Sequence, residues 1–363
     1  MADSDRAVVV GISVYPDFTT LEGPENDAAD FYEWLLDPNG GNVPERKITR
    51  VLSSTFQVGN GAPLRRQPDA CDVERPFHDL QREAVDPRTG IATKLGRRLY
   101  IYLAGHGVGL PFSNDPERTD AALLTADATN WSAPNVLARM HALYFLNAGI
   151  FDEIAVFMDC CRKEYSRLVP RLPAYIDVST IEGAVGKRRA FFAYATEWAG
   201  TARERMIDGK QRGVFTAALL RGLRHGADNQ GKVTSDSLRA YLYNRMASLL
   251  TPEERAAGAQ PTEPYIPNPE VQLTFATVAP PTALVRLRAT RYAQPVTVRI
   301  RRADFEVVCR GEIPAGGQYR AELPRDNYLA DLFTPAGELL PPVDGKTFRV
   351  VGDEEAAVDV DVQ

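Results

Sequence analysis

Two residues, Cys161 and His106, have the types and the settings that nucleophilic catalysis requires. A cysteine attacks as its thiolate, so a nearby histidine or a positive potential must activate it. Cys161 follows the apolar run Ile154–Met158 and Asp159, and His106 follows the run Arg98–Ala104 and stands between two glycines. A cysteine and a histidine that are far apart in sequence can meet in the fold. The pair therefore predicts a nucleophilic thiol with an acid–base partner.

Other interpretations of these residues stay open at this point. A histidine between two glycines can simply belong to a loop, and a lone buried cysteine is usually a small hydrophobic residue. Cys160 competes with Cys161, and only one of them can face a cleft because neighbours on an extended strand point to opposite faces. A vicinal disulfide is another interpretation, whereas a metal site is disfavoured because no third and fourth ligand stand at usable spacing. The remaining histidines lie in or beside predicted helices and are assigned structural roles: His78, His141 and His225.

Strands that alternate with helices must position the two candidates. The apolar runs are short and continuous, which is typical of strands buried on both faces of a parallel sheet. Strands are predicted over 7–13, 47–52, 98–104, 121–125, 154–158 and 190–196, and helices over 28–36, 77–84, 134–147, 214–223 and 235–250. The fold class is therefore α/β, with a mostly parallel sheet flanked by helices. Chemistry in such sheets lies at the carboxyl ends of the strands, where both candidates fall.

A change in the sequence pattern near residue 280 predicts two domains. Thr251–Pro269 carries five prolines and is predicted to be an extended connection over the surface. Val271–Ala276 is predicted to be one last strand of the first domain. Beyond Leu284, short alternating segments are separated by turns and show no helical pattern, which is typical of an all-β module. We predict an α/β domain over 1–277 and a small immunoglobulin-like or prealbumin-like sandwich over 278–363.

Composition narrows the function classes. The 363 residues are 44% hydrophobic and 25% charged, as in an ordinary globular protein. The net charge of −6 argues against nucleic-acid binding. No apolar stretch approaches the ~20 residues that span a bilayer, and the N-terminus does not resemble a signal peptide. Four cysteines, two of them adjacent, favour a reducing cytoplasm over a disulfide scaffold. The sequence has neither a Gly-x-Ser-x-Gly elbow nor a phosphate-binding Gly-x4-Gly-Lys loop, which disfavours an α/β-hydrolase or a nucleotide-binding protein.

Taken together, these features resemble the caspase-like cysteine peptidases, most closely the metacaspases and their bacterial relatives. The resemblance covers about residues 5–275. An apolar strand that ends in Asp-x-Cys is the family's catalytic-cysteine pattern, and it selects Cys161 over Cys160. The matching segments are 6–28 for the first strand, loop and helix, 99–107 for the histidine block, 154–161 for the cysteine block, and 193–204 with 213–220 for the small-subunit region. Their order, with about 55 residues between the histidine and the cysteine, makes the resemblance specific.

The resemblance implies a fold and a mechanism. It implies a caspase-like sheet, in which Cys161 attacks the peptide carbonyl and His106 protonates the leaving amine and then activates water. It also implies an oxyanion hole formed by the backbone N–H groups of Gly107 and Cys161. The family requires no third catalytic residue. The resemblance thus implies a cysteine endopeptidase that acts on protein substrates, in limited regulatory or defence-related proteolysis.

The resemblance also implies specificity for basic residues, Arg before Lys. Asp159 matches the acid of the family's specificity pocket (S1) beside the nucleophile. Glu197 falls where a second acid is expected, Glu204 is a rival alignment for it, and Asp27 belongs to the same loop region. A carboxylate in a partly desolvated pocket favours bidentate binding of an arginine side chain. Arg162 beside the nucleophile would suit the opposite preference, for Asp, but the acids favour basic residues.

The chain departs from the family pattern after the nucleophile. Many metacaspases continue with His-Ser-Gly, where this chain has Arg162-Lys163-Glu164. Calcium is the one cofactor left open, because Asp177 and Glu182 lie in roughly the loop where the family's acidic cluster is expected. The stretch from Arg162 to Arg189 is rich in Lys and Arg, so an enzyme that cuts after basic residues could cut itself there.

The all-β module carries no catalytic constellation, and its expected role is to bind a partner or to regulate the peptidase. The alternative function for the whole chain is a catalytically silent caspase-like scaffold that binds partners through this module. Such scaffolds commonly lose the histidine or the cysteine, and this chain has both. No membrane association and no nucleic-acid partner is expected.

Overall fold

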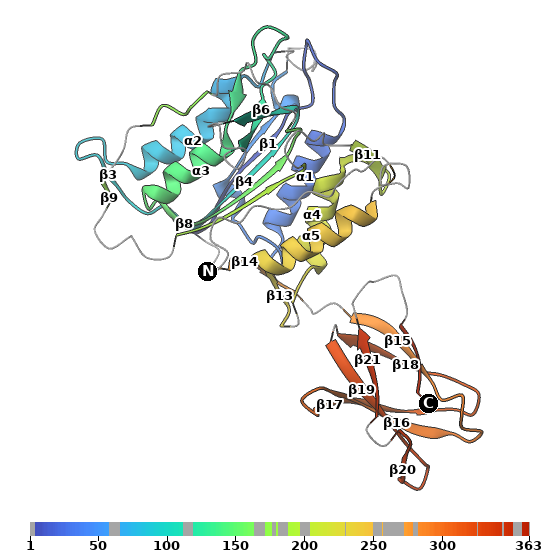
Figure 1. The fold of residues 1–363 in the computed structure, drawn as a ribbon. Helices are drawn as coiled ribbons and strands as arrows, with labels where there is room; N and C mark the ends of the chain where they lie inside the picture. Colours follow the sequence, from blue (N-terminus) through green and yellow to red (C-terminus); the bar gives the residue numbers. More distant parts are fainter. Residues whose placement is uncertain are drawn as a thin grey trace. The chain divides into compact units, whose positions relative to one another are not determined.

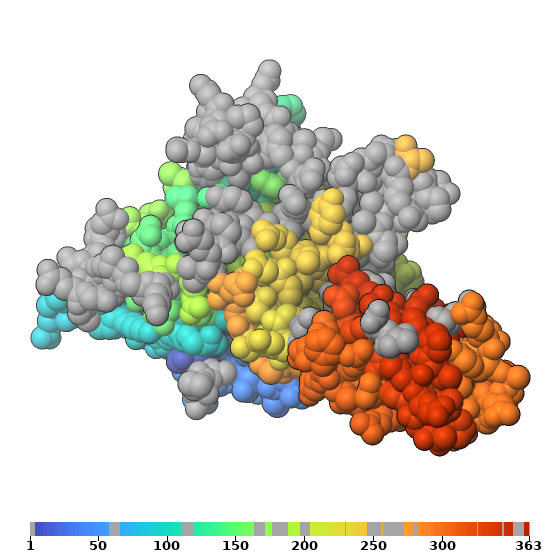
Figure 2. Space-filling view, turned by 60° about the horizontal axis from the view of Figure 1, so that its bottom comes forward, coloured from blue at the N-terminus to red at the C-terminus, as the bar shows by residue number. Residues whose placement is uncertain are grey.

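The structure is a computed structural model that describes residues 4–57, 66–111, 119–162, 171–175, 179–180, 188–196, 204–228, 230–249, 256, 272–278, 282–324, 326–342, 345–350 and 358–362. The chain divides into two compact units. The first comprises residues 1–224 and 233–276, and the second comprises 225–232 and 277–363. Figure 2 shows the described residues from 282 onward, in orange to red, as a compact body of their own. Among the described residues, none of the helices is long and apolar enough to cross a membrane.

A five-stranded parallel sheet forms the centre of the first unit (Figure 1). Its strands, in spatial order, are β10 (Arg189–Tyr194), β8 (Phe151–Asp159), β4 (Gly96–Ala104), β1 (Arg6–Gly11) and β2 (Ile48–Leu52). Every neighbouring pair runs parallel. The continuous apolar runs of β1, β4 and β8 are almost wholly buried, as a parallel sheet covered on both faces requires. The prediction of an α/β fold with a parallel sheet is confirmed.

Helices cover both faces of this sheet (Figure 1). Three helices lie on one face: α1 (Gly23–Leu36), α4 (Val214–His225) and α5 (Ser235–Leu249). Two lie on the other face: α2 (Ala70–Ala84) and α3 (Ala138–Asn147). The sequence predicted α2 from Phe77, but the helix begins at Ala70. Asp69 and Asp72 form a reciprocal capping box at that end, which satisfies backbone N–H groups that would otherwise lack partners.

Side chains of β4 alternate between the two helical layers. Leu99 and Leu103 belong to the core that includes buried side chains of α2 and α3. Tyr102 points to the opposite face, where its ring stacks on Phe31 of α1 at 4.7 Å between centroids. The Tyr102 hydroxyl also lies 2.7 Å from the hydroxyl of Thr216 in α4. Because side chains alternate with a period of two along β4, the face that each residue just beyond the end of the strand points to is also determined.

Short elements complete the first unit. The strands β5 (Gly107–Pro111), β6 (Thr119–Leu124) and β7 (Asn135–Val136) form an antiparallel sheet, and β11 (Glu204–Ile207) and β12 (Lys210–Gly213) form a hairpin. The remaining elements are β3 (Ile91–Ala92), β9 (Ser179–Thr180), β13 (Lys232–Thr234), β14 (Thr274–Thr277) and the 3₁₀ helices Glu45–Lys47 and Ser53–Thr55. The last strand predicted for the first domain is β14, and it pairs with β13 rather than with the central sheet.

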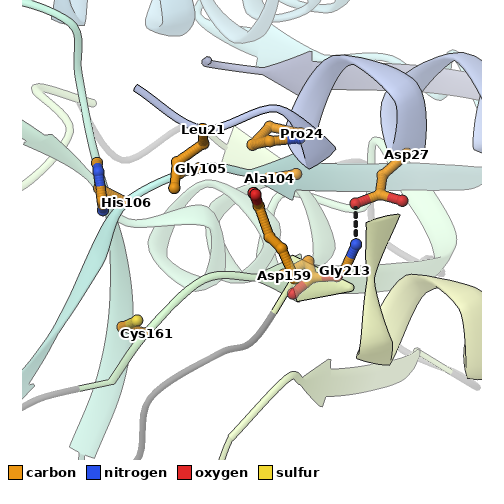
Figure 3. Close-up of a pocket in the computed structure, with 10 residues that line it drawn as sticks. Leu21, Pro24, Asp27, Ala104, Gly105, His106, Asp159, Cys161 and Gly213 are labelled. Carbon is orange, nitrogen blue, oxygen red and sulfur yellow. Dashed lines mark hydrogen bonds between the residues drawn. The ribbon is translucent and has the colours of Figure 1, made fainter. Parts of the chain in front are cut away.

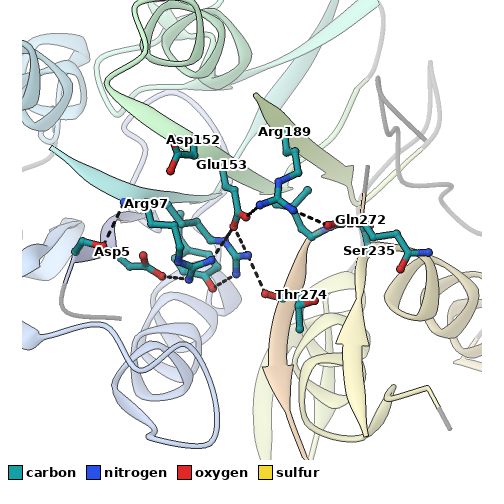
Figure 4. Close-up of polar contacts among 12 residues, drawn as sticks. Asp5, Arg97, Asp152, Glu153, Arg189, Ser235, Gln272 and Thr274 are labelled. Carbon is teal, nitrogen blue, oxygen red and sulfur yellow. Dashed lines mark hydrogen bonds and ion pairs between the residues drawn. The ribbon is translucent and has the colours of Figure 1, made fainter. Parts of the chain in front are cut away.

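A buried ionic cluster lies at the amino ends of the central strands, opposite the edge where β4 and β8 end (Figure 4). Glu153 of β8 pairs with three cations, Arg97, Arg98 and Arg189. Arg98 and Glu153 are both almost completely buried, and Arg98 Nε donates to the Glu153 carboxylate at 2.7 Å. Arg98 also donates to the carbonyl oxygen of Thr274 at 2.8 Å. The cluster therefore ties the segment that contains β14 to the base of the sheet.

The second unit contains two sheets that share one apolar core. One sheet has the strand order β18 (Tyr319–Pro324), β15 (Thr282–Arg288) and β22 (Val358–Asp361). The other sheet has the strand order β17 (Val307–Ile313), β16 (Val296–Arg302), β19 (Asp326–Phe333) and β20 (Leu339–Leu340). The strand β21 (Lys346–Val350) also pairs with β19. Alternate residues of these strands point inward, such as Val285 and Leu287, or Val298 and Ile300. All the pairings are antiparallel except that of β15 with β22. The prediction of a C-terminal all-β module is confirmed.

Candidate active site

The ends of β4 and β8 bring His106 and Cys161 to the same edge of the sheet. The two strands are neighbours and run parallel, with Ala104 paired to Asp159 at their carboxyl ends. His106 and Cys161 each stand two residues beyond these positions. Both line one pocket of about 170 Å³ (Figure 3). The structure therefore brings the two sequence candidates together at the edge where α/β folds bind ligands.

The two adjacent cysteines differ in how deeply they are buried. Cys160 is 1% exposed and belongs to the core between the sheet and α2–α3. Burial raises the pKa of its thiol well above the ordinary value, so this group stays protonated. Cys161 is half-buried, points the other way and lines the pocket. Neither cysteine forms a disulfide, and of the two only Cys161 lines the pocket.

Gly107 brings the chain after His106 directly against the two cysteines. A Cβ atom at this position would lie 2.6 Å from the Cys160 sulfur and 2.8 Å from the Cys161 carbonyl oxygen. Both separations are well inside van der Waals contact, so a side chain is excluded. Glycine thus allows two backbone segments to meet where the sequence predicted an oxyanion hole. The role of the Gly107 and Cys161 N–H groups in that hole stays a prediction.

A backbone carbonyl orients the His106 ring. His106 Nε2 lies 2.8 Å from the carbonyl oxygen of Thr19, which can only accept a hydrogen bond. Nε2 therefore carries a hydrogen in the neutral ring, and Nδ1 is the nitrogen left to exchange a proton. The Tyr15 hydroxyl accepts a hydrogen bond from the His106 N–H at 3.0 Å and donates one to the Leu124 carbonyl at 3.1 Å. The rings of Tyr15 and His106 also pack edge to face at 4.7 Å.

These contacts were not predicted from the sequence. A carbonyl oxygen has no side-chain signature, so nothing in the sequence could have identified Thr19. Tyr15 lies in the segment 6–28 that carries the N-terminal part of the resemblance, and an aromatic residue shortly after the first strand could have suggested a partner for the histidine.

Three carboxylates gather at the other end of the pocket, away from His106 and Cys161. They belong to Asp27, Asp159 and Glu204, and Figure 3 labels the first two beside Gly213. A Cβ atom on Gly213 would clash with an Asp159 oxygen, so only glycine leaves room for the carboxylates. The elements that supply the acids are α1, the end of β8 and the β11–β12 hairpin.

Hydrogen bonds hold each carboxylate in place. Asp159 accepts from the N–H and the hydroxyl of Thr216, at 3.1 and 2.6 Å. One oxygen of Asp27 accepts from the Gly213 N–H at 2.7 Å, while its other oxygen is buried without a hydrogen-bond partner. Glu204 accepts from the N–H groups of Glu22 and Gly23 at the start of α1. An incoming cation would therefore find acceptor capacity that the protein leaves unused.

The two buried aspartates hold a proton between them at neutral pH. Asp27 and Asp159 are 2% and 7% exposed. Burial and the nearby charge of Asp159 raise the pKa of Asp27 to about 9. Burial also raises the pKa of Asp159 to about 6, against the two hydrogen bonds from Thr216, which lower it. A cation that enters the pocket would favour the fully ionised pair and so be bound at the expense of this proton.

The structure describes only some of the other sequence candidates. Glu197, Asp177 and Glu182 lie outside the described residues, as does most of the stretch from Arg162 to Arg189. Of the two alternatives for the second pocket acid, the structure describes Glu204, and it lines the pocket. Within the described part of the chain, no group of three or more His, Cys, Asp or Glu residues could hold a metal ion. Calcium dependence therefore stays a prediction.

Comparison with known proteins gives an informative similarity. No protein-family model matches the sequence. Over 247 residues the chain is 27% identical to a protein described as a "probable protease" from a Desulfuromonadales bacterium. The matched region covers 65% of this chain and 27% of that protein, so the chain spans about a quarter of the length of the curated relative. The chain is therefore a distant relative of a probable protease.

Proposed function

We propose that this chain is a caspase-like cysteine endopeptidase that cleaves proteins after basic residues, Arg before Lys. The observation that carries the proposal is a single pocket with a thiol and an imidazole at one end and three carboxylates at the other. The distant similarity to a probable protease supports the general activity. The dyad supports the class of peptidase, and the acids support the specificity.

The chemistry begins with the Cys161 thiolate, which attacks the carbonyl carbon of the cleaved peptide bond. His106 Nδ1 takes the thiol proton and delivers it to the leaving amine. His106 then removes a proton from the water that hydrolyses the thioester. The Thr19 carbonyl keeps the opposite ring nitrogen protonated and holds the ring in one orientation. The backbone N–H groups of Gly107 and Cys161 stabilise the oxyanion, which is typically worth ~3–4 kcal/mol.

Specificity comes from the acidic end of the pocket. A substrate that places its reacting carbonyl at Cys161 extends the side chain of its cleaved residue toward Asp27, Asp159 and Glu204. Arginine fits best, since its guanidinium donates five hydrogen bonds in a fixed planar geometry and Asp27 offers an unpaired buried oxygen. Lysine supplies the charge without that geometry, and an acidic side chain would be repelled.

The biological setting is also a proposal. Selectivity for one kind of residue suits limited proteolysis in regulation or defence better than bulk degradation. The all-β second unit is proposed to bind a partner or a regulator, and four cysteines that form no disulfide fit a reducing cytoplasm.

A fluorogenic peptide panel tests the function. Matched peptides would carry Arg, Lys, Asp or the neutral arginine isostere citrulline at the cleaved position, with and without calcium. We expect the order Arg, then Lys, with citrulline and Asp at least tenfold slower. Equal rates on all four peptides would refute the acidic-pocket argument. No hydrolysis of any peptide or of casein would instead favour the catalytically silent scaffold.

A further inference from the structure

A buried carboxylate that the proposed mechanism does not use lies behind the nucleophile. Asp120 of β6 is fully buried in the first unit. One of its oxygens accepts from the hydroxyl of Tyr194 at 3.0 Å and from the Ala121 N–H at 2.8 Å. Its other oxygen is buried and has no hydrogen-bond partner. Burying a carboxylate oxygen without a hydrogen-bond partner costs folding free energy, so its presence needs a physical explanation.

Tyr194 connects this carboxylate to the residue that follows the nucleophile. Tyr194 is the last residue of β10, and its hydroxyl is held by Asp120. The guanidinium of Arg162 lies over the Tyr194 ring, 4.7 Å from its centroid. Arg162 also donates to the carbonyl oxygen of Thr196 just beyond β10, at 3.4 Å. The side chain next to Cys161 is thus held by the end of a neighbouring strand.

Charge adds to these contacts. Burial raises the pKa of Asp120 to about 6, while Arg139 of α3 and Arg162 act in the opposite direction. The ionised Asp120 carboxylate attracts both cations. Cys160, the buried neighbour of the nucleophile, feels the same carboxylate. Electrostatic attraction across a buried site is weakly screened and acts over several ångströms without direct contact.

We propose that Asp120 is a positioning residue for the nucleophile: through Tyr194 and Arg162 it fixes the backbone that carries Cys161. The inference rests on the proposed function, since it matters only if Cys161 is the nucleophile. Arg162 directly follows Cys161, and its side chain lies over the Tyr194 ring. Asp120 accepts a hydrogen bond from the Tyr194 hydroxyl and attracts the Arg162 guanidinium by its charge. Without the Asp120 charge, the Tyr194 hydroxyl loses its acceptor and Arg162 loses an attracting charge, so the Cys161 N–H and thiol are held less firmly.

The test compares Asp120→Asn with Asp331→Asn, its matched control. Asp331 is equally buried, pairs with Arg299 and Arg301, and belongs to the second unit. With an Arg peptide, Asp120→Asn is expected to lower kcat about 10- to 100-fold, as misplacement of a reacting group by about 1 Å does. KM should change less than threefold, because the acidic end of the pocket is untouched. Asp331→Asn should leave kcat unchanged.

Two further measurements separate positioning from a structural role. Alkylation of Cys161 by iodoacetamide should slow in Asp120→Asn at an unchanged thermal midpoint. Asp120→Asn, Arg162→Ala and the double variant should show non-additive effects on kcat, with the double variant no worse than the more damaging single one. If Asp120→Asn does not fold, Tyr194→Phe replaces it, with an expected severalfold fall in kcat at constant KM.

The inference would be overturned if the wild type is active and the folded Asp120→Asn variant keeps kcat within twofold of it. The same holds for Tyr194→Phe if that variant replaces Asp120→Asn. Either result would leave the proposed function intact. Fully additive single effects would overturn it as well. Failure of the wild type to hydrolyse any peptide would overturn the proposed function instead.

Discussion

Replacing Asp159 by asparagine should weaken catalysis and strengthen the fold. Asparagine keeps the shape of the side chain and an oxygen that accepts from Thr216, but it removes the charge. A hydrogen bond to a charged group is worth ~1.5–3 kcal/mol, so kcat/KM for an Arg peptide should fall by about 10- to 150-fold. The citrulline peptide has the same shape without the charge. Its kcat/KM should change little, so the preference for Arg over citrulline should nearly disappear.

Asp159→Asn should increase the free energy of unfolding although it weakens catalysis. The pKa of Asp159 rises from its ordinary 3.8 to about 6 on folding, which corresponds to ~3 kcal/mol of cost to the ionised folded state. Because the folded-state pKa is the higher one, this cost is present above pH 6 and vanishes below pH 4. Asp159→Asn should therefore be more stable than the wild type at pH 8, by up to about 3 kcal/mol, and the gain should shrink at pH 5.

Urea unfolding at the two pH values, together with kinetics on both peptides, tests the pair of effects. A variant that is less stable than the wild type at pH 8, and slower on citrulline as well as on Arg, would refute the reasoning. Asp159 would then be a structural acceptor for Thr216 rather than a charged anchor for substrate.

Three other variants test the surroundings of the site. Gly107→Ala forces a Cβ atom to within 2.8 Å of the Cys161 carbonyl oxygen; kcat should fall more than about tenfold, and normal turnover would contradict the close approach. Tyr15→Phe removes two hydrogen bonds beside His106, each worth ~1 kcal/mol; steady-state assays should show a severalfold lower kcat, and an unchanged kcat would refute this role. Glu153→Gln removes the carboxylate that pairs with the buried Arg98 and should cost ~3–5 kcal/mol in urea unfolding; an unchanged midpoint would mean that the cluster does not stabilise the sheet.

The sequence was sufficient to predict the edge of the sheet where the candidate residues meet. Continuous apolar runs identify β4 and β8, and the polar residues that follow them must fall at the strand ends. The choice of Cys161 over Cys160 also follows from strand geometry once the resemblance is added, because the period of two sends the neighbours to opposite faces. Such local patterns are readable from the sequence because a strand that is buried on both faces requires a continuous apolar run.

Contacts between distant segments could not be predicted in the same way. The Thr19 carbonyl is a backbone atom, and its place beside His106 depends on the path of a loop. Arg98 was interpreted only as the start of a strand, yet it is buried against Glu153 and the Thr274 carbonyl. The raised pKa of Asp27 likewise depends on its burial near Asp159, and 132 positions separate the two in the sequence. Such partners are set by topology, which a single sequence encodes only indirectly.

The most direct measurement of the central claim is covalent labelling by a peptide chloromethyl ketone with Arg at its end, followed by peptide mass spectrometry. We predict one adduct per chain, on Cys161, in the wild type and in Cys160→Ala, and none in Cys161→Ala. The rate should fall at least about tenfold in His106→Ala, which lacks the base that activates the thiol. Labelling of Cys160, or labelling of Cys161 at the same rate with and without His106, would contradict the account.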